Sequence, residues 1–405
     1  MSTPQAPFVA PTPPGASAPP QLNFLNVLQH MLAVSDKVSD LIFSPGRPPQ
    51  VELLGELQPV EVPGLEKLLP THTASLAKLI IGTHLTAGEN LQKFGSTDLS
   101  FSAPGFARFR VNIFMQRGTH AIVMRVIPNR PPQWSDYNLP TVLKEIAGMK
   151  NGIVLVTGPT GSGKSTTLAA VIDLINETKA YHIVTIEDPI EFLHMHKRAT
   201  IHQRELHSDT PSFALALRAA LRQAPKVILV GEMRDRETIE VALEAAETGH
   251  LVLSTLHTID AAKTVDRIIG VFPKNEEQSI RTRLSQSFRF IVSQRLLPRA
   301  DRQGRLAAIE ILKSTARTRE YMEYGEREGK SLTDAMEQSE LDGMQTFDSV
   351  LERYVREGLV KKEDAMAYAT NPGNFLLRLS DMGSAGSNSM PPPNSSGNSM
   401  LDMIE

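Results

Sequence analysis

A glycine-rich segment between two regular patterns constrains this chain more than any other part of it. The segment reads Gly158-Pro159-Thr160-Gly161-Ser162-Gly163-Lys164-Ser165-Thr166. Up to Ser165 it fits G-x-x-x-x-G-K-[ST], the pattern of the phosphate-binding P-loop. An unbroken apolar run at 153–156 precedes it, and apolar residues at helical spacing follow over 165–178. This strand–loop–helix order predicts a nucleoside triphosphate site, and a glycine-rich turn without a ligand is the disfavoured alternative.

Each residue type in this segment has a physical reason to be there. The glycines let the backbone curl so that successive N–H groups point at a phosphate, and the following helix adds the positive end of its dipole. Lys164 can reach the β- and γ-phosphates, and the Ser165 hydroxyl can bind Mg²⁺. We therefore predict that the segment Gly158–Thr166 binds the nucleotide.

The pattern around the P-loop predicts an α/β fold for the larger part of the chain. Strands are predicted at 152–157, 182–187, 227–231 and 251–256, with helices at 165–178, 212–223 and 236–247. Such alternation predicts a mostly parallel sheet with helices on both faces. Beyond Asp260 we expect mainly helices, over 274–297 and near 317–326, 331–340 and 346–357.

The part of the chain before the P-loop is expected to be a small α+β domain. A helical stripe begins at Phe24, and a second helix is predicted at 74–81. Strand-like segments lie at 40–44, 51–54, 99–101, 108–115 and 121–127, with a turn at Arg117-Gly118.

Changes in composition set the expected domain boundaries. Residues 1–20 are rich in Pro, Ala, Ser and Thr and are expected to be a disordered tail. The small domain spans 21–127, and a proline-rich linker spans 128–135. The P-loop domain with its C-terminal helices spans 136–380, and a second disordered tail is expected at 381–405.

Composition excludes several classes of function. There are no cysteines, which excludes disulfides and thiolate metal sites. The net charge of −3 provides no field that would attract nucleic acid, so no nucleic-acid partner is expected. No apolar run is long enough to span a membrane, and the start of the chain lacks the pattern of a secretory signal. We therefore expect a soluble intracellular protein.

Two carboxylates follow predicted strands and are candidates for chemistry on the γ-phosphate. Glu187 closes the strand at 182–187, where it could hold and deprotonate the attacking water, although Asp188-Pro189 also suits a simple turn. Glu232 follows the apolar strand 227–230, which is the Walker B arrangement that holds Mg²⁺ through its hydration shell. On its own this second pattern is weak, and the P-loop strengthens it.

Histidines and arginines supply further candidates with open alternatives. His250 and His257 bracket one predicted strand and could sense the γ-phosphate or link neighbouring subunits, although lone histidines are more often ordinary core residues. Arg110 and Arg125 lie on adjacent strands of the small domain, where they could act on a neighbouring subunit's nucleotide or only face solvent. The histidine-rich stretch 194–207 is interpreted as a solvated segment and not as a metal site.

Several motifs in fixed order resemble those of the PilT/PilU twitching-motility ATPases, which belong to the secretion-ATPase superfamily. The matching segments are 158–166, 186–192, 231–235 and 248–257, followed by Thr258–Arg267. Further matches include Ser39-Asp40-Leu41, 108–112, 218–223 and 343–348, so that the resemblance covers about residues 22–380.

The resemblance implies a homohexamer in which each subunit has a PAS-like N-terminal domain and a RecA-like ATPase domain. Glu187 then matches the catalytic carboxylate of the Asp box, and Glu232 matches the Walker B glutamate. His250 and His257 match the His box, and Arg110 and Arg125 match arginines offered to the nucleotide. ATP and Mg²⁺ are the implied substrate and cofactor.

The implied activity is ATP hydrolysis that drives retraction of a type IV pilus from the cytoplasmic side of the inner membrane. The expected partners are the inner-membrane pilus platform protein and a second retraction ATPase. The alternatives are an accessory PilU-like motor, a pilus-assembly or secretion ATPase, and a ring subunit without catalysis. Residues 314–321 depart from the family's retraction-linked stretch, and Ala224-Pro225-Lys226 is closer to PilU-like members. Assembly ATPases usually carry a four-cysteine zinc module, which this chain lacks.

Overall fold

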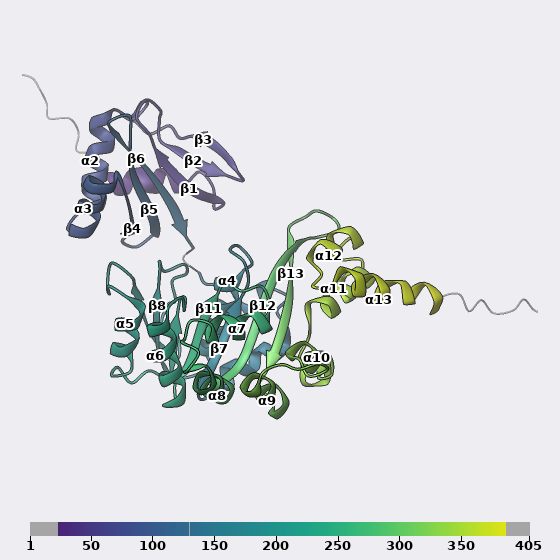
Figure 1. The fold of residues 1–405 in the computed structure, drawn as a ribbon. Coiled ribbons are helices and arrows are strands. Elements are labelled where there is room, and N and C mark those ends of the chain that lie inside the picture. The colour runs from purple at the N-terminus through teal and green to yellow at the C-terminus, as the bar shows by residue number, and fades with distance from the viewer. Residues whose placement is uncertain (1–22, 129, 386–405) are drawn as a thin grey trace, which may run out of the picture. The chain divides into compact units, whose positions relative to one another are not determined.

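The computed structural model describes residues 23–128 and 130–385 (Figure 1). The predicted N-terminal tail lies outside this range, as does the predicted C-terminal tail beyond residue 385. The chain divides into two compact units. Unit 1 runs to residue 129 and includes Glu191–Leu193, and unit 2 consists of Arg130–Ile190 and the chain from His194 onward.

Unit 1 is built on one antiparallel sheet of order β3-β2-β1-β6-β5-β4. Its strands are β1 Val38–Phe43, β2 Gln50–Leu53, β3 Glu56–Pro59, β4 Ser96–Ala103, β5 Ala107–Gln116 and β6 Thr119–Ile127. Its helices are α1 Phe24–Leu32, α2 Pro70–Ile81 and α3 Leu85–Phe94. One apolar core, with Phe43 and Phe109 fully buried at its centre, joins sheet and helices.

Sequence patterns predicted much of unit 1 because its central strands alternate between core and solvent. In β5 the buried positions are Ala107, Phe109, Val111 and Ile113. The predicted turn at Arg117-Gly118 is confirmed, since both residues have positive φ in the hairpin joining β5 to β6. Two elements were missed. Strand β3 is exposed along its whole length, and α3 carries Gly88 in its interior, so neither shows a clear pattern.

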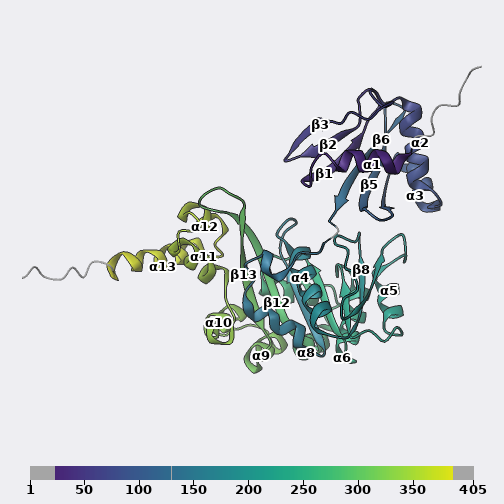
Figure 2. The same ribbon diagram turned by 180° about the vertical axis from the view of Figure 1, so that it is seen from behind.

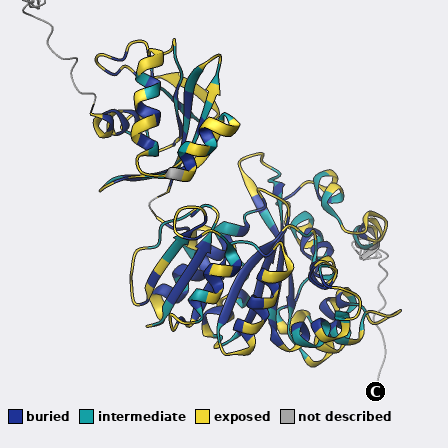
Figure 3. Cartoon of the chain, turned by 60° about the vertical axis from the view of Figure 1, so that its left-hand side comes forward, coloured by how far each residue is buried: buried dark blue, intermediate teal, exposed yellow. Residues whose placement is uncertain are grey.

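Unit 2 contains a seven-stranded sheet of order β13-β12-β7-β11-β10-β8-β9. The strands are β7 Gly152–Thr157, β8 His182–Glu187, β9 Thr200–Glu205, β10 Val227–Val230, β11 Leu251–Leu256, β12 Phe288–Pro298 and β13 Arg305–Lys313. All neighbours are parallel except β12 and β13, which form an antiparallel hairpin. Figure 3 shows the central strands as buried, which explains their continuous apolar runs.

Helices cover both faces of this sheet, as the alternating pattern predicted. The elements are α4 Lys164–Thr178, α5 Phe213–Ala220, α6 Arg236–Glu247, α7 Ala261–Ile269 and α8 Glu277–Ser287, with short 3-10 segments at Trp134–Asp136 and Thr141–Gly148. Helix α4 and the second 3-10 segment share one apolar cluster with the sheet. Helices α5 to α8 share the other. The mixed α/β architecture with a mainly parallel sheet is therefore confirmed.

The prediction of one helix over 274–297 was wrong. Helix α8 ends at Ser287, and the chain continues directly into strand β12. The aromatic and aliphatic residues Phe288, Phe290, Ile291 and Val292 are buried between β7 and β13. Pairing on both sides favours a strand there, whereas local spacing alone had suggested that the helix continues.

Five α-helices and a short 3-10 segment at Glu340–Asp342 form the described C-terminal part of unit 2, up to residue 385. The α-helices are α9 Ala316–Tyr324, α10 Leu332–Glu337, α11 Phe347–Arg356, α12 Lys362–Tyr368 and α13 Pro372–Ala385. The first three confirm the predicted helices, whereas α13 extends past the predicted boundary at 380. Leu297 and Leu306 of the β12–β13 hairpin pack against Phe347, Leu351 and Phe375 of this bundle. Figure 2 shows α11 and α12 beside the hairpin. Within the described residues, no helix is long and apolar enough to cross a membrane.

Candidate nucleotide-binding and catalytic site

The P-loop connects the carboxyl end of β7 to the first turn of α4. Gly158, Gly161 and Gly163 all have positive φ, at 141°, 78° and 90°. At Gly158 a side chain would also collide with the Gln294 carbonyl and would lie 2.6 Å from Ser162 Oγ. The turn therefore requires glycine for both conformation and space. The hydroxyl oxygen of Ser162 is buried and has no hydrogen-bond partner among the described residues, as a group facing an incoming ligand would.

Lys164 folds back over this loop. Its ammonium group donates to the carbonyl oxygens of Gly158 at 2.9 Å and Pro159 at 3.1 Å. The side chain is buried, and its Nζ lies 3.5 Å from Nδ1 of His257. Carbonyl oxygens are weaker partners for an ammonium group than phosphate oxygens, because only the latter carry a full charge. Lys164 can therefore exchange these contacts for a phosphate.

His257 connects Lys164 to Glu232. Its Nε2 lies 3.3 Å from Oε1 of Glu232, and the same oxygen pairs with Nε of Arg234. A single neutral tautomer satisfies both contacts, in which Lys164 donates to Nδ1 and Nε2–H donates to the carboxylate. Parallel pairing brings these groups together, because the ends of β7, β11 and β10 lie side by side at one edge of the sheet.

Glu187 ends the next strand, β8, beside Glu232. Its Oε1 accepts hydrogen bonds from Thr185 Oγ1 at 2.6 Å and from Gln203 Nε2 at 3.1 Å. The close approach of Gly231 to this strand, with its N–H donating to the Ile186 carbonyl at 2.7 Å, holds the two acidic turns together. The carboxylate is thus held in one orientation at the same edge as the P-loop.

The structure does not place His250 near the P-loop, His257 and the two carboxylates. His250 precedes β11 and His257 follows it, so the two histidines lie at opposite edges of the sheet. Nδ1 of His250 lies 3.0 Å from the Ala245 carbonyl oxygen at the end of α6. Six residues of extended strand separate β11's ends by about 20 Å, so His250 cannot reach a nucleotide bound on its own chain.

Arg110 and Arg125 belong to unit 1, whereas the other predicted site residues belong to unit 2. The two arginines are direct partners across β5 and β6, and both are exposed. Nε of Arg125 donates to the buried Asp40 on β1 at 3.0 Å. The pair therefore presents two positive charges on one sheet face, with one of them fixed by a buried carboxylate.

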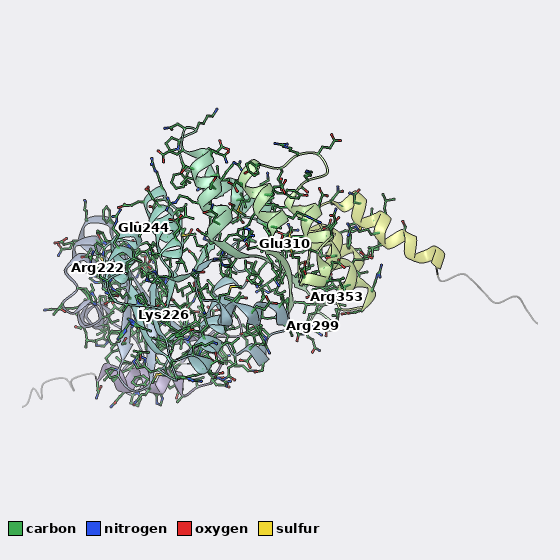
Figure 4. All side chains as sticks on the ribbon, turned by 90° about the horizontal axis from the view of Figure 1, so that it is seen from below. Arg222, Lys226, Glu244, Arg299, Glu310 and Arg353 are labelled. Atoms are coloured by element: carbon green, nitrogen blue, oxygen red, sulfur yellow. The ribbon has the colours of Figure 1, made fainter. Side chains whose placement is uncertain are left out.

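A cavity of about 360 Å³ opens beside the P-loop. Its lining includes Ser162, Gly163 and Thr166 of the P-loop segment together with Tyr137, Leu296 and Arg299. Of these, Arg299 is labelled in Figure 4. Gln294 also lines the cavity and donates from Nε2 to Thr167 Oγ1 at 2.9 Å. The size and mixed lining suit a nucleoside. Sequence patterns missed this side of the site because β12 had been predicted as helix.

The donor set suits Mg²⁺. Ser165 lies in the first turn of α4, and Glu232 is a half-buried carboxylate at the end of β10. Hydroxyl and carboxylate oxygens are the ligands Mg²⁺ prefers, and the ion takes few from the protein when a phosphate is present. Within residues 23–128 and 130–385, no cluster of three His, Asp or Glu side chains could hold a metal ion.

Two histidines of the stretch 194–207, His194 and His202, lie in different surroundings. Burial lowers the pKa of His194 to about 4, and the nearby Lys197 adds to this effect. His202 on β9 lies 2.9 Å from His182 on β8, between ring nitrogens. These contacts fix the edge of the sheet and lie away from the P-loop.

The chain is similar to a known protein family, to curated pilus ATPases and to a solved structure. The family described as Type II/IV secretion system protein matches residues 98–366. The type IV pilus retractation ATPase PilT of Pseudomonas aeruginosa is 44% identical over 352 residues, covering 86% of this chain and 99% of that protein. The type IV pilus ATPase PilU of the same organism is 38% identical over 348 residues, covering 86% and 89%. A crystal structure of the pilus retraction motor PilT with bound ADP has a TM-score of 0.77 at 41% identity, covering 87% of this chain and 99% of that one.

Proposed function

Since this chain belongs to the Type II/IV secretion system protein family, as an ATPase of its PilT/PilU branch, we propose that it hydrolyses ATP to power retraction of a type IV pilus. The observation that carries the proposal is the 44% identity with a retraction ATPase over 99% of that protein's length. The contacts of His257 with both Lys164 and Glu232 support the proposal, because they bring the P-loop and the Walker B carboxylate into one site.

The proposed reaction converts ATP and water to ADP and phosphate. Backbone N–H groups of the P-loop and the ammonium group of Lys164 hold the β- and γ-phosphates. Glu187 orients the attacking water and accepts its proton, a role that its fixed carboxylate suits. Mg²⁺, held by the Ser165 hydroxyl and through water by Glu232, would neutralise negative charge on the phosphates.

His257 is proposed to report the state of the phosphate site. Its ring contacts Lys164 on one side and Glu232 on the other. When Lys164 turns from the Gly158 and Pro159 carbonyls toward a γ-phosphate, the ring loses one partner and can donate or accept elsewhere. The loop that follows His257 leads directly into α7, so the change reaches a helix of unit 2.

We further propose a homohexamer, with unit 1 as a PAS-like domain and unit 2 as a RecA-like domain. Arg110 and Arg125 then act on the nucleotide of a neighbouring subunit. The pair of exposed positive charges on one sheet face supports this role, because a cation near the transferred phosphoryl group is worth about 10³–10⁵ in rate. Hydrolysis would then depend on assembly of the ring.

Mixing two inactive variants tests this sharing. We expect Arg110→Ala and Lys164→Ala proteins to be nearly inactive alone and to recover measurable phosphate release when mixed, because some interfaces then carry both an intact P-loop and an intact arginine. Arg110 is preferred to Arg125, since Arg125 also pairs with the buried Asp40. Arg117→Ala, in the exposed hairpin turn of the same sheet, is the control and should keep wild-type activity. No recovery at any mixing ratio would count against catalysis across subunits.

The proposed place of action is the cytoplasmic side of the inner membrane at the pilus base. There the ring would act on the pilus platform protein, and a second retraction ATPase would be an additional partner. The alternative is an accessory motor, favoured by the Ala224-Pro225-Lys226 segment that precedes β10. The 38% identity with PilU is consistent with either role.

A deletion strain distinguishes retraction from assembly. If the protein is a retraction motor, cells without it should carry more surface pili than the parent and should not twitch, because pili grow but are not withdrawn. Electron microscopy and a twitching-zone assay measure the two properties. Cells without any pili would instead identify an assembly ATPase. Hyperpiliated cells that still twitch would identify an accessory motor.

A further inference from the structure

A buried carboxylate outside the proposed catalytic group lies on β13, two strands from the residue of β7 that leads into the P-loop. Glu310 on β13 is labelled in Figure 4 and is 4% exposed. Its Oε1 accepts a hydrogen bond of 2.8 Å from the backbone N–H of Ala261, the first residue of α7. Asp260 is the N-cap residue of this helix, and the Glu310 carboxylate adds a second acceptor at the positive end of the helix dipole.

The same carboxylate is linked to the base of the P-loop. Thr157, Ser293 and Glu310 stand side by side on the neighbouring strands β7, β12 and β13. Thr157 Oγ1 donates to Ser293 Oγ at 3.0 Å, and Ser293 is the direct partner of Glu310 across β12 and β13, where its hydroxyl favours the charged form of the carboxylate. Thr157 immediately precedes Gly158, whose carbonyl oxygen receives the ammonium group of Lys164. All three side chains are buried.

Thr264 provides a second connection between Thr157 and the loop that contains His257. Thr264 on α7 donates to the Asp260 carbonyl at 2.7 Å and lies 2.6 Å from Thr258 Oγ1, the hydroxyl next to His257. Thr264 Oγ1 also lies 3.5 Å from Thr157 Oγ1. Two routes of polar groups, buried except for the half-buried Thr258, thus join the residue before the P-loop to the segment 258–261 after β11.

We propose that Glu310 is a positioning residue that holds the His257 loop and the P-loop in their mutual arrangement for ATP hydrolysis. It touches neither the nucleotide nor the reacting atoms. Its charged form accepts from Ala261 and from Ser293, which leaves the Ser293 oxygen available to accept from Thr157. When Glu310 is protonated, its carboxyl O–H donates a hydrogen bond to the Ser293 oxygen, so the hydrogen bonds beneath the P-loop rearrange. The inference rests on the proposed role of His257 in the nucleotide site.

Glu310 gains and loses its charge within the physiological range of pH. Burial raises the pKa of Glu310 to about 7, and the nearby Asp260 carboxylate adds to this. The Ala261 N–H, the Arg295 guanidinium and the Ser293 hydroxyl act in the opposite direction. Glu310 is therefore protonated below about pH 7 and charged above it. The hydrogen bonds that the charged carboxylate accepts are thus formed above about pH 7.

The test compares the full-length ATPase with its Glu310→Gln variant. The amide keeps the size and the acceptor for Ala261 but donates to Ser293, as the protonated acid would. At pH 8 we expect kcat to fall about ten- to a hundredfold while the Kd of a fluorescent ATP analogue changes less than threefold, because misplacement affects chemistry more than binding. Wild-type kcat should rise with pH through an ionisation near pH 7, and this ionisation should be missing in Glu310→Gln.

Further variants distinguish a positioning role of Glu310 from a general effect on folding and from failure of the proposed ATPase function. Glu320→Gln, an exposed residue of α9, should retain wild-type kcat and the ionisation near pH 7. Ser293→Ala keeps the charge of Glu310 but removes the link to Thr157, and it should lower kcat without removing that ionisation. Unchanged kcat and an unchanged pH profile in Glu310→Gln would overturn the inference. Loss of ATP binding in Lys164→Ala alongside normal Glu310→Gln would leave the proposed function intact and remove only the positioning role.

Discussion

Replacing Lys164 with alanine is expected to weaken ATP binding by about a hundredfold or more and to remove measurable ATP hydrolysis. Each charge-assisted hydrogen bond to a phosphate contributes about 1.5–3 kcal/mol, and the ammonium group can reach two phosphates. The chain should still fold, because the carbonyl oxygens of Gly158 and Pro159 that accept from the ammonium group carry no net charge and can accept hydrogen bonds from water instead. Titration with a fluorescent ATP analogue and an assay of phosphate release measure the two effects.

A lysine at the opposite edge of the same sheet provides the matched control for this prediction. Lys226 is exposed just before β10, and Lys226→Ala should bind and hydrolyse ATP like the wild type. If Lys164→Ala retained wild-type affinity for ATP, the glycine-rich segment would not be the nucleotide site, whatever its pattern.

The second large effect is expected for Glu232→Gln, which should bind ATP and hydrolyse it about 10²–10³-fold more slowly. The amide preserves the shape of the side chain but removes the negative charge that His257 and Arg234 now contact. Removing one preorganised electrostatic group from an active site has effects of this size. ATP affinity should change less than tenfold, since the P-loop and Lys164 are untouched. Single-turnover hydrolysis and equilibrium binding measure the two quantities separately.

Glu244 is the matched control for Glu232, because it is an exposed glutamate in the middle of α6. Glu244→Gln should have normal turnover. Wild-type turnover in Glu232→Gln would exclude this carboxylate from catalysis and would leave Glu187 as the remaining acidic candidate at that edge of the sheet.

The sequence predicted the P-loop side of the site because its signals are local. The apolar run of β7, the glycines and the amphipathic α4 are contiguous, so each supports the others within a short window. Glu187 and Glu232 could also be placed, because parallel strands bring their carboxyl ends to one edge. The same rule explains why His250 does not join His257: a histidine that precedes a parallel strand lies at the other edge.

The other side of the site depends on pairing between distant segments. Gln294, Arg299 and Glu310 are brought to the P-loop only by the β12–β13 hairpin, which joins the sheet beside β7. The aromatic and aliphatic residues from Phe288 onward suit a strand as well as a buried helix, and no turn signal separates them from α8. Glu310 carries no motif, and only its burial and its contact with Ala261 distinguish it.

The central claim is that ATP hydrolysis at the P-loop of this chain drives pilus retraction. Its most direct test is time-lapse microscopy of labelled pili in the deletion strain that expresses either the wild-type protein or the Glu232→Gln variant at equal levels. The wild-type protein should restore retraction, whereas the variant should leave extended pili that do not shorten. Retraction at wild-type speed with the Glu232→Gln variant, once its purified form is shown not to hydrolyse ATP, would contradict the account.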